Sequence, residues 1–379
     1  MAFIFLGCAL FLVYSACLVF YRQAWVALPE FRVSPEFQPR TKISVIIPAR
    51  NEEENIAPCL DSVLRQDYPT DLFEVIVVDD HSTDKTALKV REAGGGRVRL
   101  LALQDHLEAG SRLNAYKKKA IETAVGLSTG QLIVTTDADC LVQRNWLRLF
   151  ACCFESAGPV FIAAPVAYTG ETSFLGRFQS LDFMTLQGIT GASVYKKFHT
   201  MCNGANLAYS RAVFDEVGGF RNIDAIASGD DMLLMHKMYR LYPERITFLK
   251  SPEAIVRTLP MPDWRSFFNQ RVRWASKADK YDDKRIFPVL FLVYCWNLWF
   301  PVAAVWACFQ PRLGLAALGL LALKTVVEMW YLQPVARFFG KEKLLWYFPI
   351  AQPVHILYTV IAGWLGKFGT YQWKGRRVR

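Results

Sequence analysis

The chain has 379 residues, of which 53% are apolar and 21% are charged, and its formal net charge is +10. This length and composition exclude a short peptide module and a disordered chain, and they favour roughly two to three domain-sized units. The apolar residues gather at the two ends, whereas residues 22–285 have the composition of a soluble domain. An integral membrane protein with a large globular insert is therefore predicted.

The first apolar run, residues 2–21, carries no charge and is long enough to cross a bilayer as a helix. A secretory signal peptide would begin with a basic segment, but the first basic residues, Arg22, Arg32 and Arg40, follow the run. We therefore predict an N-terminal transmembrane helix at residues 1–21. By the positive-inside rule, the N-terminus lies outside and the central domain lies in the cytoplasm.

Three further apolar stretches, residues 286–309, 313–334 and 344–365, predict a C-terminal membrane region at 286–366. The third stretch contains Pro349 and Pro353, and a crossing there would place the basic tail, 367–379, outside. Three spans and four spans both stay open, with the last segment crossing, re-entrant or lying in the interface. In the second stretch, Lys324 and Glu328 are four residues apart and can pair on one helix face. A charged pair at bilayer depth could mark a functional site, but a structural salt bridge against a neighbouring helix is expected.

The central region alternates strands with helices. The predicted strands are 43–47, 73–78, 98–102 and 131–136, and the predicted helices are 52–66, 83–92 and 116–125. This alternation predicts an α/β fold with a mostly parallel sheet covered on both faces. The ligand crevice of such a sheet lies beyond the carboxyl ends of its strands. Two acidic clusters, 79–80 and 137–139, follow strands and should meet there.

The chemistry of these acids favours a metal-bridged nucleotide. No GxGxxG opens the first helix and no GxxxxGK[ST] occurs, so dinucleotide binding and P-loop phosphate transfer lack their glycine-rich cradle. Carboxylates repel phosphates unless a hard divalent cation lies between them. Asp137 and Asp139 could bind Mg²⁺ or Mn²⁺ while a diphosphate supplies further oxygens.

Five motifs occur in an informative order: ISVIIPARNEEENI (43–56), VIVVDDHSTDKT (75–86), TTDADC (135–140), ASGDDMLL (227–234) and QRVRW (270–274). With them, the chain resembles the membrane-bound family-2 glycosyltransferases, which include cellulose, chitin and hyaluronan synthases and ceramide glucosyltransferase. The resemblance covers about residues 42–280. It implies a GT-A nucleotide-diphospho-sugar transferase domain, with a Rossmann-like, mostly parallel sheet, and transfer with inversion at the anomeric carbon.

The resemblance also implies a donor site. The nucleobase is expected at Pro48, Ala49, Arg50 and Glu52, and the base and ribose at Asp79 and Asp80. The metal is expected at Asp137 and Asp139. From the residues alone, Asp79 and Asp80 could equally cap the helix that follows them.

The remaining implied roles concern catalysis, the phosphates and the acceptor. Asp231 matches the general base, with Asp230 beside it on the donor side, although both acids could simply favour a helix N-terminus. Further donor contacts are implied for Lys117, Lys118, Gly204, Asn206, Gln270, Arg271 and Arg273, with Ala205 in the same loop as Gly204. Tyr116 stands where relatives commonly have a glycine before the two lysines. Trp274 would stack on the acceptor, unless the QRVRW segment is only an interface anchor.

The predicted domains are thus a helix at 1–21, a GT-A domain at 42–257, an amphipathic segment at 258–285, a membrane region at 286–366 and a tail at 367–379. The expected function is inverting transfer from a nucleotide-diphospho-sugar to a lipid or glycan acceptor at the cytoplasmic membrane face. A processive polysaccharide synthase and a non-catalytic sugar-nucleotide-binding membrane protein are the alternatives. The basic residues adjoin the spans, which favours anionic lipid and not nucleic acid as the counter-charge.

Overall fold

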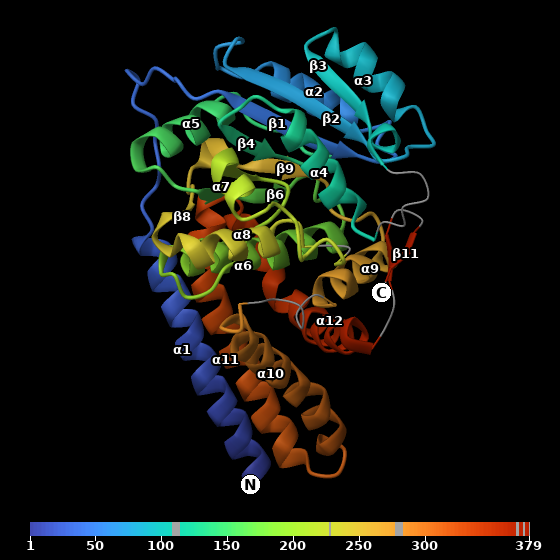
Figure 1. Ribbon diagram of the computed structural model, residues 1–379. Helices are drawn as coiled ribbons and strands as arrows, with labels where there is room; N and C mark the ends of the chain where they lie inside the picture. Colours follow the sequence, from blue (N-terminus) through green and yellow to red (C-terminus); the bar gives the residue numbers. More distant parts are fainter. Residues whose placement is uncertain (108–113, 227–228, 277–282, 369–370, 374–375, 379) are drawn as a thin grey trace.

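The computed structural model describes residues 1–107, 114–226, 229–276, 283–368, 371–373 and 376–378. An α/β domain stands on a bundle of long helices that points away from it (Figure 1). Parts of several predicted segments lie outside the described residues: 227–228 of the ASGDDMLL motif, 277–282 of the amphipathic segment, and Lys374, Gly375 and Arg379 of the basic tail.

The α/β domain is built on a seven-stranded sheet with the order β3-β2-β1-β4-β7-β5-β8. β3, β2, β1 and β4 are parallel, and β7 runs antiparallel to both of its neighbours. β6 and β9 form a separate parallel pair. The strands are β1 Ile43–Ala49, β2 Phe73–Asp79, β3 Val98–Ala102, β4 Leu132–Thr135, β5 Phe161–Ala163, β6 Val166–Tyr168, β7 Leu207–Ser210, β8 Ile246–Phe248 and β9 Val256–Thr258.

Helices cover both faces of the sheet because the strand side chains alternate between two apolar cores. Ile43, Val45 and Ile47 pack under α2 and α5, whereas Ile46 faces α4, α6 and α8. The helices of this domain are α2 Ile56–Leu64, α3 Thr86–Gly94, α4 Tyr116–Leu127, α5 Trp146–Ala157, α6 Phe174–Tyr195, α7 Arg211–Glu216, α8 Met232–Leu241 and α9 Trp264–Ala275.

The core that contains Ile46 continues without interruption into the helical bundle. It joins the sheet and α6 to α1 (Ala2–Ala27), α10 (Ile286–Ala307) and α11 (Pro311–Phe338). Among the described residues, four helical stretches are long and apolar enough to cross a membrane: these three and Glu342–Gly366. The last stretch contains α12 (Phe348–Phe368), which leaves the bundle and packs along α9 (Figure 1).

The predicted fold class, α/β with a mostly parallel sheet beside membrane helices, is confirmed. The four strands predicted from the sequence correspond to β1, β2, β3 and β4. The expected salt bridge in α11 is present, with Lys324 Nζ 2.7 Å from Glu328 Oε1. The side chain of Gln352 on α12 hydrogen-bonds both partners, and Tyr14 Oη of α1 donates to Glu328. A buried polar cluster therefore ties three apolar helices together.

Two buried side chains fasten α1 to the α/β domain. Lys250 Nζ donates to the carbonyls of Trp25 and Leu28, at 2.8 and 2.9 Å, and so satisfies the C-terminal end of α1. His199 Nε2 lies 3.0 Å from both Tyr21 Oη and Ser193 Oγ. Burial lowers the pKa of His199 from 6.5 to about 4, so the ring is neutral in the folded protein at neutral pH.

This pKa predicts acid sensitivity. The unfolded chain takes up the proton first, so the contribution of His199 to stability is present above about pH 6.5 and is lost as the pH falls towards 4. We expect the unfolding temperature of the purified protein in detergent to fall over this range, and His199→Gln to flatten part of that fall. His106→Gln, at an exposed position, is the matched control. Equal pH slopes for His199→Gln and the wild type would contradict the assignment.

Candidate active site

A cavity of about 1110 Å³ opens where β1, β2 and β4 end, and it continues to α1, α6, α9, α10 and α12. It contains most of the site residues predicted from the sequence. Those that line it are Pro48, Ala49, Arg50, Glu52, Asp80, Lys117, Asp137, Asp139, Gly204, Ala205, Asp230, Asp231, Gln270, Arg271, Arg273 and Trp274. Residues far apart in the sequence thus meet at the carboxyl ends of the strands, as expected for this type of sheet.

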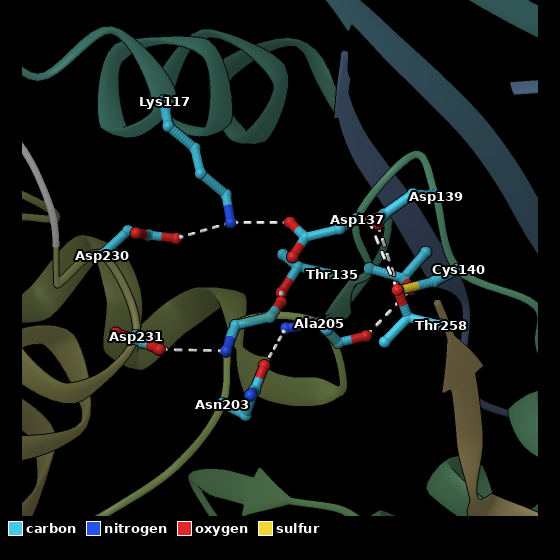
Figure 2. Close-up of polar contacts among 12 residues, drawn as sticks. Lys117, Thr135, Asp137, Asp139, Cys140, Asn203, Ala205, Asp230, Asp231 and Thr258 are labelled. Carbon is cyan, nitrogen blue, oxygen red and sulfur yellow. Dashed lines mark hydrogen bonds and ion pairs between the residues drawn. The ribbon is translucent and has the colours of Figure 1, made fainter. Parts of the chain in front are cut away.

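Lys117 lies between Asp137 and Asp230 (Figure 2). Its Nζ is 2.7 Å from Asp137 Oδ1, beyond β4, and 3.2 Å from Asp230 Oδ2, before α8. Burial disfavours the ammonium, but Asp137 and Asp230 outweigh burial and hold the pKa of Lys117 above its ordinary value. Lys117 is therefore a fixed positive charge between two acidic loops.

Asp231 is held in a single orientation by backbone amides. Gly204 N donates to its Oδ2 at 3.0 Å, and Met232 N donates to its Oδ1 at 2.7 Å, so that Asp231 caps α8. A Cβ at position 204 would lie 3.3 Å from Asp230 Oδ2 and 3.4 Å from Lys117 Nζ, so a larger residue there would contact this ion pair. The helix-cap interpretation of Asp231 and a role in the cavity are thus compatible.

Asp139 is positioned by its neighbours on the other side of the cavity. Thr258 Oγ1, at the end of β9, donates to Asp139 Oδ2 at 3.3 Å, and Cys140 Sγ lies 3.6 Å from Oδ1. Burial and the Asp139 carboxylate raise the pKa of the Cys140 thiol well above its ordinary value. Cys140 is therefore a neutral thiol and not a nucleophile.

The donor set fits a divalent cation only in part. Asp137 and Asp139 offer hard oxygen ligands, but the described chain contains no group of three or more His, Cys, Asp or Glu residues that could hold a metal. Mg²⁺ commonly binds one or two carboxylates and completes its shell with substrate phosphates and water. The residues present fit a cation that is bound jointly with a diphosphate.

In the same cavity, Arg50 links the loop that follows β1 to the loop that follows β2. Its Nη1 donates to the carbonyls of Asp80 and His81, at 2.7 and 3.1 Å. The ring Nδ1 of His81 is 2.9 Å from Asp80 Oδ1. Pro48 and Glu52 line the cavity beside these contacts.

Three predicted residues do not line the cavity. Asp79 Oδ1 accepts a hydrogen bond from Ser82 N and caps the turn. Lys118 is buried and donates to the carbonyls of Ile223 and Ile226, at 2.6 and 2.7 Å. Asn206, also buried, accepts from Trp146 Nε1 and donates to two backbone carbonyls beneath the cavity. Adjacent positions on a helix point in different directions, which separates Lys118 from Lys117.

The QRVRW segment forms part of α9 and is braced by an acid that the sequence reasoning missed. Arg271 Nη2 lies 2.7 Å from Asp182 Oδ2 of α6, and both side chains are buried. The Arg271 guanidinium also lies 4.3 Å from the ring centre of Trp274, and its Nη1 is 3.0 Å from Gln270 Oε1. A lone aspartate in the apolar sequence of α6 was the available signal for Asp182.

Comparison with known proteins now decides the family. The sequence matches glycosyl transferase family 2 over residues 44–218, and glycosyl transferase family group 2 over residues 132–365, which is more than half of the chain. The chain belongs to glycosyltransferase family 2. In that setting, the α/β domain is a GT-A domain and the cavity lies where the sequence motifs of the family converge.

Individual members of the family show the extent of the likeness. "Probable glycosyltransferase YdaM" of Bacillus subtilis is 29% identical over 259 residues, 65% of this chain and 57% of that protein. The beta-monoglucosyldiacylglycerol synthase of a Synechocystis species is 25% identical over 341 residues, 86% of this chain and 62% of that protein. The chain thus spans less than two thirds of either relative's length.

A solved structure extends the likeness in fold. The mannosyltransferase PcManGT from Pyrobaculum calidifontis, in complex with GDP-Man and Mn²⁺, has a TM-score of 0.60 at 22% identity. The match covers 94% of this chain and 98% of that one. The fold, including its helical part, therefore extends over nearly the whole of both chains.

The position of Lys117 predicts the affinity of the donor-free protein for divalent cations. Lys117→Met removes the charge that neutralises Asp137 and Asp230, so we expect Mn²⁺ to bind the donor-free variant at least about tenfold more tightly. Free Mn²⁺ can be measured by electron paramagnetic resonance during titration. Lys119→Met is the matched control, because Lys119 pairs with Glu122 on the same helix, 3.0 Å away. Identical Mn²⁺ affinities for Lys117→Met and Lys119→Met would refute this role.

Proposed function

We propose that this family-2 glycosyltransferase is an inverting enzyme that transfers a sugar from a nucleotide-diphospho-sugar to a hydroxyl acceptor at the cytoplasmic face of a membrane. One observation carries the proposal. Lys117 pairs with Asp137 and Asp230 in a cavity that Asp139 and Asp231 also line, and that cavity continues to helices that are apolar enough to span a membrane.

For the donor, we assign the nucleobase and ribose to the part of the cavity lined by Pro48, Ala49, Arg50, Glu52 and Asp80. The diphosphate would then lie between Asp137 and the α9 helix. Arg273 can bind phosphate oxygens in a bidentate manner from α9. The complex of the structurally similar PcManGT with GDP-Man and Mn²⁺ supports a donor of this class.

For the cation, the assigned ligands are Asp137 and Asp139. When bound, Mg²⁺ or Mn²⁺ would offset the diphosphate charge and favour departure of the nucleotide. Lys117, released from Asp137 by the incoming cation, is close enough to serve the same phosphates. Lys118 and Asn206 would support the site indirectly, because each donates hydrogen bonds to two backbone carbonyls.

For the chemistry, Asp231 is assigned as the general base. The acceptor oxygen forms a bond to the anomeric carbon while the bond from that carbon to the diphosphate breaks, and the hydroxyl proton passes to the Asp231 carboxylate. Backbone amides of Gly204 and Met232 fix that carboxylate, so it requires little reorganisation during the step. Trp274, braced by Arg271, would form the floor under the acceptor.

For the membrane arrangement, we propose three spans, α1, α10 and α11, with α12 lying in the interface beside α9. The packing of α12 along α9, and the prolines in its first half, support this choice over a fourth span. The basic tail then stays on the cytoplasmic side, consistent with the positive-inside rule. The close contacts among α1, α10 and α11 favour a solid bundle, which weighs against the processive alternative.

The experiment is a donor screen with the purified full chain in detergent and Mg²⁺ or Mn²⁺, reading released nucleoside diphosphate. We expect release from one donor, and a loss of at least about 100-fold on Asp231→Asn with donor affinity nearly unchanged. Asp139→Ala or chelation of the metal should abolish metal-dependent donor binding as well. Asp224→Asn, at an exposed position near the same loop, is the control and should behave as wild type.

The outcomes separate the candidate functions. An unimpaired Asp231→Asn variant would exclude Asp231 as the base. Metal-dependent donor binding with no release, across a panel of acceptors, would favour the non-catalytic alternative. A polymeric product would favour the processive synthase.

A further inference from the structure

The cavity changes character beyond the acidic residues. The same cavity is lined by uncharged side chains of three helices that adjoin the membrane region: Leu186 and Ile189 of α6, Phe287 and Leu290 of α10, and Thr359 and Ala362 of α12. We call the part of the cavity that these six residues line the corridor. These six side chains carry no charge and offer dispersion contacts, which suits hydrocarbon and not sugar.

The corridor opens to the outside at the beginning of α10. Phe287 and Phe291 both line the cavity, yet 51% and 59% of their surfaces are exposed. Their rings stack with centroids 6.3 Å apart. Ile286–Ala307 is a candidate membrane span, and both rings belong to its first two turns, at one end of the span. Aromatic side chains are typical of that level of a bilayer, and a chain could pass there from the lipid.

The charges around the corridor distinguish between two kinds of lipid head. Lys117 is paired with Asp137 and Asp230, and the buried Arg271 is paired with Asp182. His355, which also lines the cavity, lies 4.0 Å from the same Asp182. Among the cationic residues described along the cavity, Arg50 serves the nucleotide end and Arg273 is assigned to the donor phosphates. A second phosphate, on an acceptor, would lose its water without gaining a cation of its own.

From these observations we infer that the corridor binds the hydrocarbon chain of an uncharged lipid alcohol, whose hydroxyl reaches Asp231 and Trp274. This inference rests on the proposed function and commits it to one acceptor class. A neutral hydroxyl needs only the Asp231 carboxylate as a hydrogen-bond partner and adds no charge to the cavity. On this inference, a phosphorylated polyprenol is a poorer acceptor than a neutral lipid alcohol.

The test uses the full chain in phosphatidylcholine nanodiscs, with the donor that the screen identifies. The acceptor probes are dioleoylglycerol and a long-chain polyprenol as neutral alcohols, and undecaprenyl phosphate as the anionic lipid. We expect labelled sugar on a neutral alcohol and none on the phosphate. Transfer to undecaprenyl phosphate in preference to the neutral probes, or donor hydrolysis with no lipid product, would overturn the inference.

Two tryptophan variants test the corridor itself. Leu186→Trp fills it and should lower transfer to the long-chain acceptor at least tenfold, while transfer to a short-chain analogue with the same head and the affinity for the donor stay within twofold. Leu318→Trp is the control, because Leu318 is 64% exposed on α11 and does not line the cavity. Equal losses, or no loss, in both variants would overturn the corridor. Absence of nucleoside diphosphate release from the wild type would instead refute the proposed function, on which the inference rests.

Discussion

The mutual repulsion of four carboxylates in one cavity is the constraint on which the site depends. Asp137, Asp139, Asp230 and Asp231 come from two loops that are nearly a hundred residues apart, and one ammonium, that of Lys117, holds the nearest of them together. Backbone amides and a threonine hydroxyl fix the others. This arrangement places negative charge where a cation could bind together with a diphosphate. In the donor-free protein, Lys117 offsets the repulsion between the two loops.

The sheet and the bundle act as one body because a single apolar core runs through both. α6 packs on the sheet with one part of its surface and on α1 and α11 with another. Buried polar contacts fix the positions of the helices relative to one another. Lys250 binds the C-terminal end of α1, and the Lys324–Glu328 pair links α11 to α1 through Tyr14 and to α12 through Gln352. The cavity can therefore extend from the nucleotide loops to the membrane helices with a fixed geometry.

The first half of the α/β domain was predictable because its strands are long, buried on both faces and separated by amphipathic helices. Later strands such as β5 and β8 have three residues each, which is too few for an alternation of apolar and polar residues to be recognised. β7 also runs antiparallel to its neighbour β4, which breaks the pattern of strands and helices in a parallel sheet. At the site, the motifs placed Asp137 and Asp231 in the cavity. They could not separate Lys117 from Lys118 or detect the brace from Asp182, because side-chain direction and long-range pairing depend on packing that no local motif encodes.

The same charge balance makes the two ends of the cavity different, so each end favours a different substrate in the proposed reaction. Among the described residues, Lys117 and Arg271 are paired with aspartates, so the proposed acceptor end favours an uncharged hydroxyl. In the proposed function, the acids at the donor end would bind a cation together with the diphosphate. Trp274 lines the same cavity, and the Arg271 guanidinium that lies over its ring is held by a buried pair with Asp182. A chain filling the corridor would keep water from Asp231, which favours transfer to the acceptor over hydrolysis of the donor.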